Sequence, residues 1–295
     1  MSGAANRARR QLLATGLAAA VFAASGVPVR AAARRGGTLR AGLGGGSASD
    51  SWDGAGHEGL FMQAVGAGAV FDTLTEVAAD GTLRGELAVG WEPLEQARVW
   101  DVTLREGVRF HDGAPFTGAD VVATFARLGA TGPLAQVSDI ALEGPSRVRL
   151  VLETANPNFP YELSDPRLIV QPGGVVGPVG TGLYRAVAFE PGRRFVGRRV
   201  DGHWRDGQAG WFDRVDVLAF DPAAVRLAAL RSGRVDAIDG VELHAVGMLR
   251  AAGDHALQEA GSWLQAVSHR VGVPPRVGTS RPMDDARFLE RWWAA

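Results

Sequence analysis

The chain has 295 residues, 46% of them hydrophobic, which allows one large domain or two small domains with a sizeable core. Its 31 basic residues are all arginine and its formal net charge is −1, so the composition gives no support for nucleic-acid binding. The sequence contains no cysteine, which excludes disulfides, thiol chemistry and the cysteine that a lipoprotein anchor needs.

Residues 1–33 have the pattern of an export signal. Arg9 and Arg10 precede an uncharged, mostly apolar run over 12–29, and a run of alanines at its end offers a cleavage site. The arginine pair resembles the twin-arginine export motif, although Ala8 stands where serine or threonine is usual. An ordinary secretory signal and an uncleaved anchor are the alternatives, and the short apolar run disfavours the anchor. We therefore expect an exported, periplasmic protein without a stable membrane anchor.

Beyond this segment the hydrophobic pattern alternates between strand and helix periods, which predicts a mixed α/β fold. Strands are predicted over 38–43, 99–105, 140–142, 147–152, 184–189, 194–199, 215–219 and 235–238. Helices are predicted over 58–70, directly after Thr117, and over 223–231. Thr117 and Asp120 have the spacing of a capping box, and Asp112-Gly113 predicts a tight turn just before it.

Residues 99–125 carry the most specific pattern, VWDVTLREGVRFHDGAPFTGADVVATF. It closely resembles the signature W-x-x-x-L-R-x-G-V-x-F-H-D-G-x-P-F-T-x-x-D-V of the family 5 extracellular solute-binding proteins. These proteins are the peptide, oligopeptide and nickel receptors of bacterial ABC importers. Shorter segments resemble the same family in the same order, namely FDTLTE at 71–76, GTGLY at 180–184, DGHW at 201–204 and LRSGRVD at 230–236.

The resemblance implies the first lobe of a type II periplasmic binding protein fold, with mixed sheets and flanking helices. This solute-binding lobe would cover residues 34–270. The segment 271–295 contains PMDDAR, which resembles the helix that opens the second lobe of family members. Those proteins continue through a complete second lobe, so we expect the second lobe to be missing here. Because such receptors close two lobes around the solute, the expected binding is weak.

A glycine-rich segment, GLGGGSASDSWDG at 42–54, follows the first predicted strand. It lacks the helix start that a phosphate site needs, so nucleotide binding is disfavoured. The resemblance implies that this loop faces the ligand cleft, with Ser47 and Asp50 as ligand-binding candidates and Trp52 as a cover over the solute. A glycine-rich backbone allows close approach to a ligand. A plain solvent-exposed loop is the alternative.

Asp165-Pro166-Arg167 follows a short aromatic run and gives the second group of ligand-binding candidates. In nickel-type members of the family, a similar position carries an arginine that meets carboxylates in the cleft. Arg167 is therefore a candidate for holding a solute carboxylate through a bidentate pair, with Asp165 beside it. A surface arginine without such a role is the alternative.

The six histidines are scattered without the spacing of metal ligands, and no G-x-S-x-G motif is present. We expect neither an enzyme, nor a cofactor, nor a directly bound metal. The partners implied by the resemblance are a small peptide or similar solute and the permease subunits of an ABC importer, with no nucleic acid and a monomeric state. A truncated remnant with little or no ligand binding is the alternative function, and a secreted hydrolase lacks a nucleophile–base arrangement.

Overall fold

The computed structural model describes residues 36–77, 82–206, 208–260 and 263–268. The chain divides into the units Met1–Ala33 and Arg34–Ala295, and every described residue lies in the second unit. The predicted export signal and the predicted second-lobe segment 271–295 therefore lie outside the described residues.

A seven-stranded mixed sheet has the strand order β12-β13-β11-β1-β10-β9-β8. Its strands are β1 (Thr38–Leu43), β8 (Tyr184–Glu190), β9 (Arg194–Arg199), β10 (Arg214–Ala219), β11 (Ala237–Ile238), β12 (His255–Ala260) and β13 (Trp263–Ser268). β1 runs parallel to both of its neighbours, β10 and β11, while the other pairs are antiparallel. Leu39, Ala41 and Leu43 alternate toward one face of β1 and are buried there, as the period-two pattern predicts.

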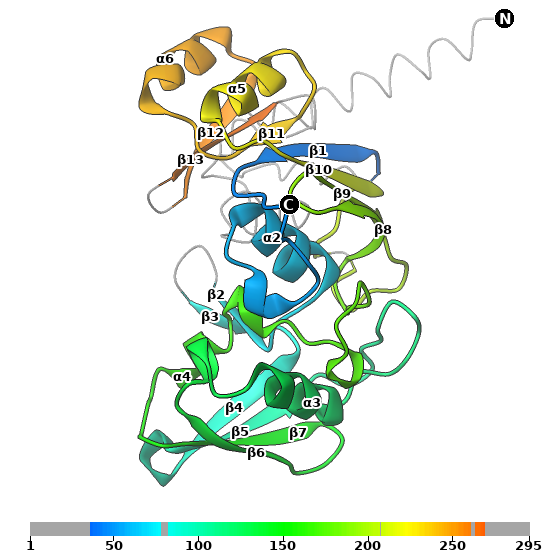
Figure 1. Cartoon of the computed structure of the whole chain (residues 1–295), viewed down its shortest axis with the longest axis vertical. Helices are drawn as coiled ribbons and strands as arrows, with labels where there is room; N and C mark the ends of the chain where they lie inside the picture. Colours follow the sequence, from blue (N-terminus) through cyan, green and yellow to red (C-terminus); the bar gives the residue numbers. More distant parts are fainter. Residues whose placement is uncertain (1–35, 78–81, 207, 261–262, 269–295) are drawn as a thin grey trace, which may run out of the picture. The chain divides into compact units, whose positions relative to one another are not determined.

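Helices cover both faces of this sheet. α2 (Leu60–Gln63) continues directly into the wider helix η2 (Ala64–Val70), and their side chains join Leu39 and Leu43 in one core cluster. α5 (Ala223–Arg231) and α6 (Leu243–Ala252) lie beside β11 to β13 (Figure 1) and form a second cluster with Ile238. One face of β1 is thus buried in the first cluster, and on its other face Gly42 lies against Phe220 and Ile238 while Arg40 stays partly exposed.

A four-stranded antiparallel sheet has the order β4-β5-β7-β6. Its strands are β4 (Ala88–Leu94), β5 (Val99–Leu104), β6 (Val137–Leu142) and β7 (Arg147–Leu152), and α3 (Gly118–Leu128) lies along it (Figure 1). Val121 and Phe125 from α3 pack onto Trp100, Val102 and other side chains of this sheet. The signature segment thus supplies a central strand and the helix that covers it.

Short elements connect these layers. The hairpin β2 (Thr75–Val77) with β3 (Leu83–Gly85) forms a separate two-stranded sheet. The remaining helical turns are η1 (Gly54–Gly56), η3 (Glu95–Ala97), η4 (Gly132–Leu134), α4 (Phe159–Glu162), η5 (Pro166–Leu168) and η6 (Pro172–Gly174). A buried ion cluster ties the hairpin to the segment after β9, because Arg205 contacts both Glu76 and Glu86.

Most predicted elements are confirmed, including the capped helix. Thr117 N–H donates to Asp120 Oδ2 at 2.8 Å and the Thr117 side chain accepts from the Asp120 N–H, which together form the predicted capping box. The Thr117 hydroxyl also donates to Asp120 Oδ2 at 3.0 Å. Asp112 also shapes the predicted turn, since its Oδ1 accepts from Ala114 N–H at 2.9 Å and Gly113 has φ +92°.

The strand predicted over 140–142 begins earlier, at Val137. Two further predicted boundaries are wrong for a packing reason. The helix expected over 58–70 begins only at Leu60, because Gly59 is extended and a Cβ there would lie 1.9 Å from the Gly45 carbonyl oxygen. The strand expected over 235–238 is limited to Ala237–Ile238, because Val235 N–H turns back to the carbonyl of α5 residue Ala229. Each of these two contacts joins residues that are not neighbours in the sequence, so the hydrophobic periodicity does not predict them.

Candidate functional site

The carboxyl ends of three parallel strands meet at one edge of the seven-stranded sheet, since β1 lies between β10 and β11. In open α/β sheets, ligands bind outside the carboxyl ends of the strands, where the connections leave in different directions. The chain leaves these three ends as Gly44–Asp50, Phe220-Asp221 and Asp239-Gly240. We call these three segments the strand-end site.

Two carboxylates hold the glycine-rich loop of the strand-end site. Gly44 N–H donates to Asp239 Oδ1 at 3.1 Å, and Gly45 N–H donates to Asp221 Oδ1 at 3.3 Å. Gly45 has φ +76°, a backbone conformation that favours glycine. A Cβ at Gly46 would lie 2.6 Å from the side chain of the last residue of β10, so the loop packs there without room for a side chain.

Arg226 of α5 ties two of the strand ends together. Its buried guanidinium places Nε 2.9 Å from Asp239 Oδ1, and Nη1 donates to the Asp221 carbonyl at 2.7 Å. Burial raises the pKa of the Asp239 carboxyl, and attraction to Arg226 and the Gly44 N–H offset only part of that effect. Arg226 was not predicted as part of the site. The one signal in the sequence that could have indicated it is its position inside a mostly apolar helix.

Ser47 and Asp50, two of the predicted ligand-binding residues, lie together in the strand-end site. Asp50 Oδ2 accepts from Ser47 N–H at 2.9 Å, and Asp50 N–H donates to the Ser47 carbonyl at 2.9 Å. The Ser47 side chain is exposed and lies 2.7 Å from the Ser49 hydroxyl, whereas Asp50 is buried. Asp50 therefore shapes the turn that presents the Ser47 hydroxyl to solvent.

Trp52, the third candidate of this loop, packs against the core. Its ring centroid lies 4.3 Å from that of Phe189, and it makes edge contacts with Phe71 and Phe195 at 6.1 and 6.3 Å. The ring is half-buried at the border of the main core cluster. A role as a cover over a solute remains a prediction, and the observed packing gives Trp52 a structural role as well.

Asp165 and Arg167 form a bidentate pair with each other. Arg167 Nε donates to Asp165 Oδ1 at 2.8 Å and Nη2 donates to Oδ2 at 2.7 Å. Burial opposes ionisation of Asp165, but the hydrogen bonds from Arg167 outweigh it and lower the pKa of the carboxyl. Since Asp165 occupies the fork of the guanidinium, a solute carboxylate would have to compete with it for Arg167.

The two predicted groups of candidates meet through their backbones. A Cβ at Gly54 would lie 2.4 Å from the Arg167 carbonyl oxygen, and Gln171 Nε2 donates to the Trp52 carbonyl at 3.0 Å. Arg127 from α3 reaches the same place, where it donates to the side chain of Gln171 at 3.1 Å. Gln171 and Arg127 were not predicted as part of the site, because their separation in sequence gives no signal for this contact.

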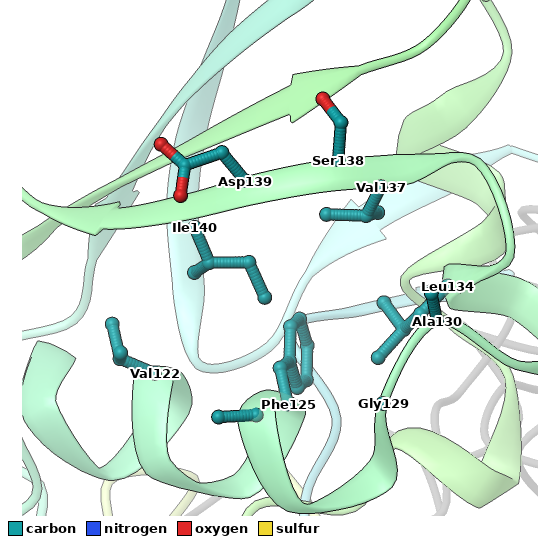
Figure 2. Close-up of a pocket in the computed structure, with 10 residues that line it drawn as sticks. Val122, Phe125, Gly129, Ala130, Leu134, Val137, Ser138, Asp139 and Ile140 are labelled. Carbon is teal, nitrogen blue, oxygen red and sulfur yellow. The ribbon is translucent and has the colours of Figure 1, made fainter.

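A separate cavity of about 340 Å³ lies between α3 and β6. Figure 2 shows Val122 and Phe125 facing Ile140 across it, while Ser138 and Asp139 point away from the helix. Apolar lining without convergent polar groups offers no means of orienting a polar solute. We therefore place the candidate site at the strand ends and not in this cavity.

Within the part of the chain that the structure describes, no three histidine, aspartate or glutamate side chains are grouped so that they could hold a metal ion. None of the helices in the described ranges has the length and apolar character needed to cross a membrane.

Comparison with known proteins gives the family. The profile described as "Bacterial extracellular solute-binding proteins, family 5 Middle" matches residues 82–288, more than half of the chain. The chain belongs to this family. The resemblance seen in the sequence is thereby confirmed, and the family is one of solute-binding proteins and not of enzymes.

Individual family 5 relatives match the chain over part of their length. The nickel-binding periplasmic protein of Escherichia coli (strain K12) is 25% identical over 191 residues, covering 59% of this chain and 36% of the relative. The probable D,D-dipeptide-binding periplasmic protein DdpA of the same organism is 24% identical over 204 residues, covering 61% and 39%. The chain thus spans between a third and two fifths of the length of these relatives.

Solved structures confirm the predicted fold class. The binding protein AgaA of A. tumefaciens R10, solved in complex with agropinic acid, superposes on the chain with a TM-score of 0.67 and 27% identity. The match covers 75% of this chain and 47% of AgaA. The mixed sheets and flanking helices described above are therefore those of a periplasmic binding protein.

Proposed function

We propose that the chain captures a small solute at the strand-end site, as the binding component of an ABC importer. One observation carries the proposal: in a family 5 chain, Asp221 and Asp239 hold the Gly44–Ser47 loop at the carboxyl ends of three parallel strands. That arrangement exposes the Ser47 hydroxyl and loop backbone at the place where open α/β sheets bind ligands. Asp50, Trp52, Asp165 and Arg167 are proposed to border the bound solute.

The proposed solute class is a peptide or a similar small solute, with a metal chelate as a variant of it. Support comes from relatives whose names refer to a D,D-dipeptide and to nickel. Arg167 offers a guanidinium that is 40% exposed in its side chain, so a carboxylate of either solute class could exchange with Asp165 as its partner.

The proposed place of action is the periplasm. Its support is the export-signal pattern of residues 1–33, with cleavage near Ala33, together with membership of an extracellular family. The proposed partners are the permease subunits of the importer, and the proposed state is a monomer.

We propose that binding by residues 34–270 alone is weak. Receptors of this architecture bury the solute by closing two lobes, and the sequence resemblance assigns residues 34–270 to the first of them. The alternative is little or no solute binding by these residues.

A paired glycine substitution tests solute capture. In Gly46→Ala the new Cβ would lie 2.6 Å from the end of β10 and displace the loop, whereas Gly56→Ala has nothing within 4 Å and serves as the control. Saturation-transfer NMR with di- to pentapeptides, and calorimetry with a nickel–histidine complex, should detect weak binding in wild type and Gly56→Ala but not in Gly46→Ala. Absence of any signal in the wild type would support the alternative of little or no binding, and submicromolar affinity would overturn the weak-binding claim.

A further inference from the structure

Three arginines stand in one row across β8, β9 and β10. The register pairs Arg185 with Arg198 and Arg198 with Arg214, so the three residues are direct neighbours on antiparallel strands. Directly paired residues project from the same face of a sheet, and neighbouring strands are about 4.8 Å apart. Arg185 and Arg198 are exposed, and the Arg214 side chain is 43% exposed. We call these residues the arginine row.

The arginine row is unfavourable for the isolated fold. Like charges directly opposite each other on a sheet repel and destabilise the pairing. Other arginines on these strands are neutralised: Arg194 forms a bidentate pair with Asp216, with contacts of 2.9 and 2.5 Å. Arg214 Nη2 lies 3.9 Å from Oδ2 of this same Asp216, so the carboxylate that pairs with Arg194 is shared with the arginine row. A local arrangement that opposes stability is typical of a functional surface.

We propose that the arginine row docks the folded chain on an anionic phospholipid surface. Charge complementarity is the first argument, because three guanidinium groups on the open face of a sheet match closely spaced phosphate headgroups. The second argument is that the row reaches the first strand of the sheet, since Arg214 is paired with Thr38 at the start of β1. Arg34 and Arg35 precede that strand in the sequence, directly after the predicted export segment.

The docking is peripheral and reversible by salt, and it brings a solute receptor close to the membrane where its importer lies. That role in delivery rests on the proposed function, but the contact with lipid does not involve the strand-end site. An acidic protein surface fits the observations less well, because the row is an open charged strip across three strands of a sheet. A solute-binding failure and a lipid-binding failure are therefore distinguishable.

Vesicle flotation with residues 34–295, which contain every described core cluster, tests this inference. Vesicles of equal phosphatidylglycerol and phosphatidylcholine are compared with pure phosphatidylcholine at 50 and 300 mM sodium chloride. The triple variant Arg185→Gln, Arg198→Gln, Arg214→Gln is compared with a control of equal charge change, Arg147→Gln, Arg231→Gln, Arg250→Gln, at positions that are exposed elsewhere. Circular dichroism verifies that each triple variant is folded.

Each arginine near an anionic surface strengthens binding about fivefold, so loss of the arginine row should weaken binding to the mixed vesicles at least about tenfold. The control triple should stay within about twofold of wild type, and the high salt concentration should release the wild type. Equal losses in both triples, salt-insensitive binding to pure phosphatidylcholine, or binding to polyglutamate without binding to vesicles would each overturn the inference.

Discussion

Arg205 Nη2 lies 2.6 Å from Glu86 Oε1, and both side chains are almost fully buried. The same nitrogen lies 3.1 Å from Glu76 Oε2, and the guanidinium stacks 4.4 Å above the centre of the Trp204 ring. Glu86 also accepts from the N–H and hydroxyl of Thr73 at 3.1 and 3.0 Å. One buried arginine thus compensates two buried carboxylates and joins the β2–β3 hairpin to the segment after β9.

Replacing Arg205 by methionine should lower the free energy of unfolding by about 3–5 kcal/mol, because two buried carboxylates lose their cation. Arg194→Met removes a partly exposed pair with Asp216 and should cost at most about 1 kcal/mol. Urea unfolding followed by circular dichroism measures both. Equal losses of unfolding free energy in the two variants would show that the buried cluster stabilises the fold no more than an exposed pair does.

Asp120→Ala should lower the free energy of unfolding by about 1–2 kcal/mol. The substitution removes the cap on Thr117 and a third hydrogen bond, from Gly173 N–H to Asp120 Oδ1 at 2.9 Å. Asp139→Ala, on the exposed side of β6, is the control and should stay within about 0.5 kcal/mol of wild type. A thermal melt in which the two variants coincide would contradict the capping role.

The stability of the chain should fall as the pH drops below about 6.5, with His111 contributing to the fall. His111 Nε2 donates to the Gly182 carbonyl at 2.8 Å, so the ring joins the signature turn to the GTG segment in its neutral form. Burial lowers the pKa of His111 from 6.5, although the Gly182 carbonyl, Asp72 and Asp112 raise it. Below pH 6.5 the unfolded chain binds more protons than the folded chain, and protonation therefore favours unfolding.

His111→Gln removes this titration and should flatten the slope of unfolding free energy against pH, by at most about 1.4 kcal/mol per pH unit. Urea titrations at pH 5.5 and 7.5 give the slope for both proteins. His57, whose pKa is lowered mainly by burial, contributes in the same direction and keeps part of the slope in the variant. Parallel slopes for wild type and variant would refute the contribution of His111.

Sequence patterns predicted the local structure well, because strand and helix periods, caps and turns depend on neighbouring residues. The hairpin of β8 and β9, the helix α5 over Ala223–Arg231 and the capping box of Thr117 are examples. The family was also predictable, since the signature segment has a specific order of residues.

The geometry of the site was less predictable. Tertiary packing creates the contact of Arg226 with Asp239 and the arginine row. The pairing of Arg167 with Asp165 is one choice among several partners that the sequence offers. Arg167 shows the limit most clearly, because the sequence predicts a bidentate pair with a solute carboxylate. The structure instead fills the fork with a carboxylate two residues away.

Arg226→Met should loosen the strand-end site. Loss of the guanidinium leaves the Asp239 carboxylate without its cation, and the Gly44 N–H that binds this carboxylate should exchange faster with solvent. Arg231→Met, at an exposed position of the same helix, is the control and should leave the exchange rate unchanged. Hydrogen exchange measured by NMR gives both rates. Unchanged protection of Gly44 in Arg226→Met would contradict the tie between the strand ends.

Mapping a solute onto the backbone tests the central claim most directly, namely that the strand-end site is where this family 5 chain captures its solute. The measurement is a ¹H–¹⁵N correlation spectrum of the chain during titration with a mixture of di- to pentapeptides, and separately with a nickel–histidine complex. We predict saturable shifts that centre on the amides of Gly44–Asp50, Asp221 and Asp239. Shifts centred on the cavity between α3 and β6, with none at the strand ends, would contradict the account.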